Sequence, residues 1–322
     1  MTIEIFKQEN CDLESFTDVS ADLERLPFDE LPNLSTSLKI DALNKSLAVD
    51  WASDRSSMWL GREDETHTGF AVLKHLDWDS GILGVSCASL TLHLTSCTES
   101  SRKATASLLI HQALTHCRME NIQFLSTKIY SDRFAKMHAL EDAGFRLMDA
   151  EMILRFSGNA DAEAKVEGLE FSTKSQEEVP GLATMGKLFR LSRFFADPRI
   201  SDEKAAEFWS ASVKDSCLGH ADSFLVAMAN ETAQGFVTFM DNLDFDALDG
   251  PSIRSFFHVG VAASAQGQGV GTALVRAATT ASIEFDHILV ETQSRNMAAL
   301  SLYQKCGFRI IGSRFAFHLW LS

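Results

Sequence analysis

The feature that most constrains the fold of this chain is an internal repeat. Ala143-Gly144-Phe145-Arg146 returns as Cys306-Gly307-Phe308-Arg309, a spacing of 163 residues (308 − 145 = 163). The same spacing pairs two further positions, Ser131 with Ser294 and Ala135 with Ala298. Each copy has the same order of an apolar strand, a polar break, an amphipathic helix, Gly-Phe and another apolar strand. This shared order at a single spacing indicates a duplicated unit.

A polar segment separates the two copies. Residues 157–168 read SGNADAEAKVEG, which is small, polar and without apolar periodicity. A chain of 322 residues is long enough for two domains with separate cores. We therefore expect a first domain at residues 1–157, a linker at 158–167 and a second domain at 168–322. The fold class expected is α/β of the α+β type, with two similar folds in tandem, each a mixed and mostly antiparallel sheet flanked by helices.

The second half has clear elements. Apolar runs and alternation predict strands at residues 168–173, 223–228, 235–240, 255–261, 288–293 and within 309–321. Helical periodicity and end signals predict helices at residues 179–190, 202–217, 271–283 and 296–305.

Charge and composition exclude several classes of partner. The formal net charge is −15, whereas nucleic acids and anionic membranes require basic patches. No apolar run approaches the ~20 residues that span a bilayer. The six cysteines form no Cys-x-x-Cys pair or zinc-like spacing, so we expect reduced thiols and no metal site. Together these features predict a cytoplasmic protein that binds neither nucleic acid nor membrane.

A glycine-rich loop, residues 259–272, links a predicted strand to a predicted helix. Gly267, Gly269 and Gly271 stand at every second position, where they allow close backbone approach and positive φ. The unpaired first-turn amides of the helix can hold a phosphate or pyrophosphate. A P-loop would need a lysine before Thr272, and a dinucleotide fingerprint has another glycine spacing. A glycine-rich turn without any ligand remains the alternative.

Two motifs in this half resemble one family. Gln266-x-x-Gly269-x-Gly271 resembles motif A of the GCN5-related N-acetyltransferase (GNAT) superfamily, and Asn296-x-x-Ala299-Leu300-x-x-Tyr303-x-x-x-Gly307-Phe308 resembles its motif B. The resemblance covers about residues 168–322. It implies an acyl-CoA-dependent N-acyltransferase with acetyl-CoA as co-substrate and no metal. The residues it implies for acetyl-CoA binding are Val259, Val261, Gln266, Gly267, Gln268, Gly269, Val270, Gly271, Thr272 and Asn296.

The resemblance also implies a reaction, direct attack of an amine on the thioester. It makes Tyr303 the general acid for the departing thiolate, because a phenol with a pKa near ~10 is protonated at neutral pH. It points to the backbone amide of Val259, or a neighbour splayed by a bulge, for the oxyanion. Tyr303 as a core aromatic and Asn296 as a helix N-cap are the structural alternatives.

The base is less defined by the sequence. His258 lies on the strand before the loop, and histidine suits a base near neutral pH. A structural histidine is the alternative for His258. Glu291 on the next strand is a lesser candidate, and water can replace a fixed base.

The first half lacks the corresponding residues. At the spacing of the repeat, the loop Gln266–Gly271 falls on Lys103–Leu108, which contains no glycine. Asn296 falls on Arg133, and Tyr303 falls on Leu140. We therefore expect a degenerate first copy that binds no CoA.

The acceptor is suggested by a finer resemblance, to the group of dTDP-fucosamine acetyltransferases. It rests on Leu76-Asp77-Trp78-Asp79-Ser80, on Ser192-Arg193-Phe194-x-x-Asp197-Pro198 and on the motif B entry from Thr292. Arg193 and Phe194 are its implied substrate-binding residues, and Arg190 with Arg199 completes a cluster suited to a diphosphate. The solvated basic face is the alternative for this cluster. Another small amine, an amino acid, a protein N-terminus or a non-catalytic acyl-CoA sensor remains open, as does a homodimer.

Overall fold

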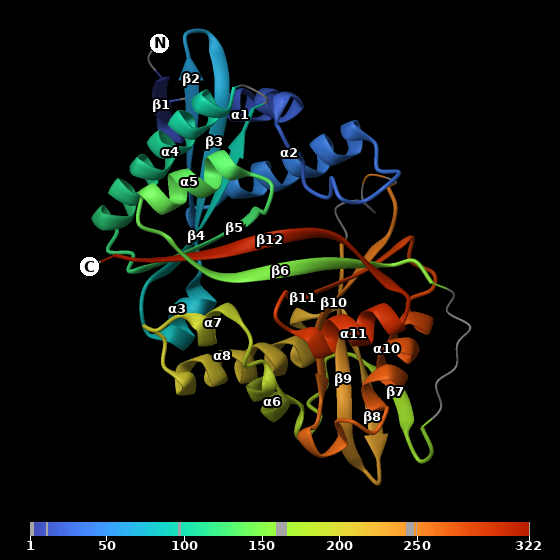
Figure 1. Cartoon of the computed structure of the whole chain (residues 1–322). Helices are drawn as coiled ribbons and strands as arrows, with labels where there is room; N and C mark the ends of the chain where they lie inside the picture. Colours follow the sequence, from blue (N-terminus) through green and yellow to red (C-terminus); the bar gives the residue numbers. More distant parts are fainter. Residues whose placement is uncertain are drawn as a thin grey trace. The chain divides into compact units, whose positions relative to one another are not determined.

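The computed structural model describes residues 3–10, 12–95, 98–158, 166–242, 248 and 250–321, and Figure 1 labels its helices and strands. The chain divides into two compact units. The first unit contains Met1–Met148 and Arg314–Ser322, and the second contains Asp149–Ser313. None of the helices in the described ranges is long and apolar enough to cross a membrane.

The first unit is built on a mostly antiparallel sheet. Its strands pair in chain order, β1 (Ile3–Lys7), β2 (Ser56–Glu63), β3 (Thr66–His75), β4 (Cys87–Leu94) and β5 (Phe124–Tyr130). Only the β4–β5 pair is parallel. The last part of β12 (Phe308–Trp320) then pairs antiparallel with β5, from Arg314 opposite Tyr130 to Trp320 opposite Phe124.

Helices cover both faces of this sheet (Figure 1). They are α1 (Leu13–Val19), α2 (Thr36–Ala52), α4 (Glu99–Met119) and α5 (Phe134–Asp142), while α3 (Asp77–Leu83) connects β3 to β4 and buries none of its residues. Neighbouring residues of a strand point to opposite faces, and both sides are apolar. Trp59 packs into the core shared with α4 and α5, while Leu60 packs into the core shared with α1 and α2.

The second unit has a sheet of the same kind. Its strands pair in the order β7 (Glu170–Lys174), β8 (Ser223–Ala229), β9 (Thr232–Asp241), β10 (Ile253–Val261), β11 (His287–Gln293) and β6 (Arg146–Phe156). Only β10–β11 is parallel. On one face lie α10 (Val270–Thr280) and α11 (Met297–Lys305) with Leu274 and Tyr303 in the core. On the other lie α6 (Leu182–Met185) and α8 (Asp202–Asp215).

The two copies of the repeat have matching elements. Moving the bounds of β5 (Phe124–Tyr130) by 163 residues gives those of β11 (His287–Gln293), and moving α5 (Phe134–Asp142) gives α11 (Met297–Lys305). After each helix the chain turns at a left-handed glycine, Gly144 with φ 89° and Gly307 with φ 92°. A Cβ at Gly307 would also lie 3.0 Å from the backbone of Gly158. The mixed α/β fold with two similar units in tandem, expected from the repeat, is what the structure has.

The last strand of each copy joins the other unit. Residues 149–156 of β6 belong to the second unit, and residues 314–320 of β12 belong to the first. The expected domains, 1–157 and 168–322, follow the two copies of the repeat. The compact units have different boundaries, between residues 148 and 149 and between residues 313 and 314. Residues 159–165 of the expected linker 158–167 lie outside the described residues.

One expected helix is broken. Residues 179–190 form α6 (Leu182–Met185) and a 3₁₀ turn (Gly186–Leu188), followed after a gap by α7 (Arg193–Ala196). A Cβ at Gly186 would lie 2.4 Å from the backbone oxygen of Trp209. This segment therefore packs closely against α8 at Gly186, and the helical conformation ends at Phe189, with φ −76° and ψ 44°. The helix expected at residues 202–217 changes to a wider π turn at Ser216.

Four of the cysteines lie in the described ranges, Cys87, Cys117, Cys217 and Cys306. All four are buried, free thiols. Cys11 and Cys97 lie outside the described residues.

Candidate active site

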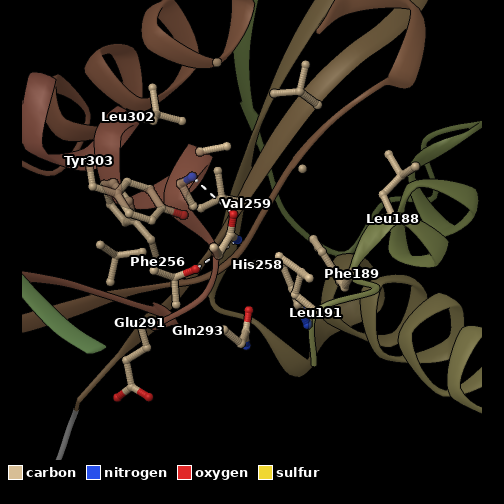
Figure 2. A pocket seen from close by; sticks show the side chains of 18 of the residues that line it. Leu188, Phe189, Leu191, Phe256, His258, Val259, Glu291, Gln293, Leu302 and Tyr303 are labelled. Carbon is tan, nitrogen blue, oxygen red and sulfur yellow. Dashed lines mark hydrogen bonds between the residues drawn. The ribbon is translucent and has the colours of Figure 1, made fainter. Parts of the chain in front are cut away.

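A cleft of about 540 Å³ lies within the second unit, and Figure 2 shows its side chains. Its walls come from the segment before α7, from α8, β10, the glycine loop, β11 and α11. They are formed by Leu188, Phe189, Leu191, Ser192, Trp209, Phe256, Phe257, His258, Val259, Gly260, Val261, Gln266, Gly267, Gly271, Val290, Glu291, Thr292, Gln293, Asn296, Ala298, Ala299, Leu302 and Tyr303.

The cleft opens where two parallel strands diverge. β10 and β11 pair only from Ile253 opposite His287 to Phe256 opposite Val290. Beyond this point β11 stays paired with β6, and β10 stays paired with β9. The register between β10 and β9 shifts between Phe256 and His258, so that Phe257 is the extra residue of a β-bulge. A bulge bends its strand and increases the local twist, which accounts for the divergence.

The backbone of Val259 and Val261 faces this opening. Ala262 donates its N–H to the oxygen of Gln234, 2.8 Å away, on the side of β9. Because backbone groups alternate between the two sides of a strand, the N–H and C=O groups of Val259 and Val261 point away from β9. The side chain of Gln266 agrees with this, since its Nε2 donates to the oxygen of Val261 at 3.2 Å. The edge is a row of backbone donors and acceptors without a partner strand.

The glycine loop ends at the start of α10. Gly269 is the N-cap of the helix, with φ 82° and no side-chain cap. The amides of Val270, Gly271 and Thr272 therefore lack helical acceptors and lie at the positive end of the helix dipole. Gln268 braces the loop by donating Nε2 to the oxygen of Ser264 at 2.7 Å. This geometry suits a phosphate group without any basic side chain.

Tyr303 lies on α11 with 4% of its surface exposed. Burial, with the nearby Cys306, raises the pKa of Tyr303 above its usual value, so the phenol stays protonated at neutral pH. Figure 2 shows its hydroxyl directed toward β10 at Val259. The hydroxyl has no hydrogen-bond partner among the described residues, which leaves it available to a ligand in the cleft.

Asn296 orders the start of α11. Its Oδ1 accepts from the N–H of Ala299 at 3.2 Å, and its Nδ2 donates to Oγ1 of Thr292 at 3.1 Å. The N-cap alternative for Asn296 is thus present in the structure, and the same residue also lines the cleft.

His258 is enclosed by its neighbours. Only 3% of it is exposed. Its Nε2 lies 3.2 Å from the hydroxyl of Ser212, and its Nδ1 lies 3.2 Å from that of Thr238. The Phe189 ring stacks on it with centroids 5.7 Å apart. Burial, and to a lesser degree His220, lowers the pKa of His258 to about 3. These contacts favour a neutral, structural histidine and give no support to a base.

The structure gathers most of the sequence-predicted site residues around one cleft. Val259, Val261, Gln266, Gly267, Gly271, Asn296, Tyr303, His258 and Glu291 line it. Gln268, Gly269, Val270 and Thr272 shape the loop and the start of α10. Arg193 and Phe194 are not among the lining residues; Phe194 is 1% exposed and packs on Phe208 with ring centroids 4.1 Å apart.

Sequence reasoning missed the apolar wall of the cleft, which Leu188, Phe189, Leu191, Trp209 and Phe257 form. An apolar residue in a sequence is ordinarily read as core. The broken helix brings Leu188, Phe189 and Leu191 to the cleft, and the β-bulge brings Phe257 there. A pairing shift of one residue in β10 leaves no signal in its composition.

Residues 185–308 match the model of the acetyltransferase (GNAT) family. This match supports the GNAT superfamily. A GCN5-related N-acetyltransferase from Sphaerobacter thermophilus has a similar fold, with a TM-score of 0.60 at 13% identity over 99% of this chain and 95% of that chain. Comparison with curated protein sequences gives no significant match.

Two further solved GNAT structures are similar in fold. A tandem GNAT protein from the clavulanic acid biosynthesis pathway, solved without AcCoA, gives a TM-score of 0.60 at 13% identity, over 99% of this chain and 98% of that chain. The glucosamine N-acetyltransferase region of a fungal multi-domain GH3 beta-N-acetylglucosaminidase gives 0.61 at 15% identity. The match covers 99% of this chain and 38% of that one. At these identities the likeness establishes a tandem GNAT architecture and no specificity.

The first GNAT-like unit has a corresponding split, and its own chain fills it. Parallel pairing of β4 with β5 stops at Ser89 opposite Ser126. A bridge between Leu23 and Thr95 follows, and Glu24 donates its N–H to the oxygen of Leu94 at 2.9 Å. The split edge of the first unit is therefore already hydrogen-bonded.

The glycine loop also has no counterpart in the first unit. Residues 103–108, at the loop's place in the repeat, lie within the continuous helix α4. The side chain of Thr98 caps this helix by accepting from the N–H of Ser101 at 3.2 Å, and Glu99 adds a negative charge to its first turn. The Thr98 hydroxyl already accepts a hydrogen bond from the first turn of this helix, and the Glu99 carboxylate already supplies a negative charge there. The start of α4 is therefore a poor site for a phosphate.

Proposed function

We propose that the second unit transfers an acetyl group from acetyl-CoA to a primary amine by direct attack of the amine on the thioester. The observation that carries this proposal is the open edge of β10 facing the same cleft as the Tyr303 hydroxyl. A backbone donor and a protonated phenol on either side of one cleft can serve the two charges that develop in acyl transfer.

The residues have distinct tasks in this proposal. The first-turn amides of α10 hold the pyrophosphate, and the edge at Val259 and Val261 binds the pantetheine as an added strand would. The N–H of Val259 stabilises the oxyanion that forms when the amine attacks. As the C–N bond forms and the C–S bond breaks, Tyr303 donates a proton to the thiolate sulfur. Water accepts the proton of the amine, because His258 is enclosed and its lowered pKa makes it a weak base.

The acceptor has several candidates. A nucleotide-linked amino sugar follows from the sequence resemblance around Arg193 and Phe194. The arginines of that segment give it little support, since Arg190 pairs with Asp202 at 2.6 Å and neither Arg193 nor Arg199 lines the cleft. Amino acids, protein N-termini and other small amines fit the same mechanism. A silent acyl-CoA sensor would bind acetyl-CoA without turnover.

Two measurements test the proposal together. Calorimetry with acetyl-CoA reports binding, and thiol release in the presence of a panel of primary amines reports transfer. Binding with amine-dependent release of thiol is the expected result. Binding without release for any amine would point to the sensor, and absence of binding would overturn the site itself.

A further inference from the structure

The cleft has an unusual balance of charge. None of the described residues that line it is lysine or arginine, and Glu291 is the single acidic residue among them. Phosphate and carboxylate groups are commonly bound by arginine or lysine, often with bidentate geometry. One such group can sit on the first-turn amides of α10, which the acetyl-CoA pyrophosphate would take. A second anionic group in the same cleft would meet no cationic side chain among the described lining residues.

The part of the cleft formed by the segment before α7 and by the bulge of β10 is apolar and partly exposed. Leu188 is 40% exposed, Leu191 is 38% exposed and Phe257 is 46% exposed, and all three line the cleft. Figure 2 shows Leu188, Phe189 and Leu191 together, across β10 from Tyr303. Large apolar side chains that gather at a cleft and remain exposed mark a surface that binds an apolar partner.

The side chains of this wall are held by contacts with one another, and their polar atoms already have hydrogen-bond partners within the protein. Trp209 donates its ring N–H to the hydroxyl of Ser192 at 2.7 Å. The Phe189 ring lies 5.4 Å from the Trp209 ring and stacks on His258. Arg295 donates to the backbone oxygen of Leu191 at 2.8 Å. These hydrogen-bond partners all belong to the protein itself. Trp209 and its neighbours therefore present ring faces and methyl groups, and not hydrogen-bond donors, to the amine substrate.

We propose that the acceptor is a primary amine on an apolar body, aromatic or branched aliphatic, that carries no phosphate or carboxylate. The proposal rests on the acyl transfer proposed above. The apolar body packs against Leu188, Leu191 and Phe257, which places the amino group near the acyl carbon between Val259 and Tyr303. A nucleotide diphosphate would instead meet a wall that has no lysine or arginine among its described residues.

The test uses matched amines with the full chain and acetyl-CoA. 2-Phenylethylamine is compared with phenylalanine, which adds only a carboxylate, and with glucosamine 1-phosphate, which carries a phosphate on a polar body. Thiol release is expected to give 2-phenylethylamine a kcat/KM at least tenfold above the other two. A preference for phenylalanine or glucosamine 1-phosphate would overturn the acceptor class while leaving acyl transfer intact.

Variants of the apolar wall test whether it binds the body of the amine. Phe257→Ser and Leu191→Ser are expected to raise KM for 2-phenylethylamine at least fivefold and to leave the Kd of acetyl-CoA unchanged. Leu218→Ser is the control, because Leu218 is 46% exposed and does not line the cleft. An unchanged KM in both wall variants contradicts the proposal. Absence of thiol release with every amine, when calorimetry shows that acetyl-CoA binds, would overturn acyl transfer together with the acceptor class.

Discussion

The ammonium group of Lys136 donates a hydrogen bond to the backbone oxygen of Leu92 at 2.9 Å. Leu92 lies on β4 in the split of the first unit, where strand pairing with β5 has ended. The carboxylate of Glu24 lies 3.3 Å from Lys136, and its side chain is buried. Burial lowers the pKa of Lys136, and Glu24 opposes that effect. An internal ion pair thus lies in the split of the first unit. The corresponding split of the second unit is the open cleft.

The first prediction concerns stoichiometry. Because the split of the first unit is filled and its helix α4 is self-capped, calorimetry is expected to give one acetyl-CoA per chain. Lys136→Met should lower the free energy of unfolding by about 1–3 kcal/mol, through loss of a buried hydrogen bond, without a change in the Kd of acetyl-CoA. Lys214→Met, at an exposed lysine of α8, is the control and should change neither. A second equivalent of bound acetyl-CoA would contradict this account of the first unit.

The second prediction concerns the proton donor. Tyr303→Phe removes the hydroxyl that faces β10 and keeps the ring that packs on Phe308, with centroids 5.9 Å apart. We expect kcat to fall by about 100-fold, within the usual range for loss of a general acid, while the Kd of acetyl-CoA stays the same. Tyr130→Phe alters the other tyrosine, whose hydroxyl donates to Glu30 in the first unit. It should affect stability alone, and an equal loss of kcat in both variants would remove Tyr303 from the mechanism.

The third prediction concerns the glycine loop. Gly269→Val places a β-branched residue at φ 82°, a left-handed conformation that valine strongly disfavours. The start of α10 must shift, and the Kd of acetyl-CoA should rise at least tenfold. Gly168→Val imposes a similar strain at φ 73° with open space around it and outside the cleft. Calorimetry that shows the same Kd for both variants would argue against a pyrophosphate site at this loop.

The fourth prediction separates the two roles considered for His258. Its pKa lies below that of an unfolded histidine, so below about pH 6.5 the unfolded chain binds a proton that the folded chain does not. Stability contributed in this way is lost as pH falls from about 6.5 toward 3, by up to about 1.4 kcal/mol for each pH unit. Urea unfolding of His258→Gln should show a shallower dependence over this range.

Activity supplies the complementary measurement for His258. If the residue is structural, His258→Gln should keep kcat within about fivefold of the wild type, with the acidic limb of the pH profile, where protonation would inactivate a base, unchanged. A loss of about 100-fold or more, together with an altered pH profile, would restore His258 as the base.

The second unit was more accessible to sequence reasoning than the first. The motif residues from Gln266 to Gly271 and from Asn296 to Tyr303 depend on local chemistry, because glycine and helix-cap positions have fixed conformational needs. The order of the two motifs along the chain also predicted that their residues would lie around one site. The helix expected at residues 296–305 from its own end signals is α11 (Met297–Lys305) in the structure.

The features that the sequence did not reveal depend on contacts between distant residues. The bulge at Phe257 is a shift in pairing with β9. The close approach of α6 to α8 places the backbone of Trp209 against Gly186. The filled split of the first unit joins Glu24 to Leu94, 70 positions later in the sequence (94 − 24 = 70). None of these has a short-range pattern, since each is decided by packing.

The exchange of β6 and β12 has a consequence for cooperativity. Phe317, from the final strand, is 1% exposed in the core of the first unit, while Leu154, from the first copy, is fully buried in the core of the second. Removal of the first copy would take β6 from the second unit, and removal of the second copy would take the end of β12 from the first unit, each with part of a core. We therefore expect the chain to melt in a single calorimetric transition. Separately expressed copies would each lack a strand and expose a strand-pairing edge, so neither is expected to be stable until the two reassociate.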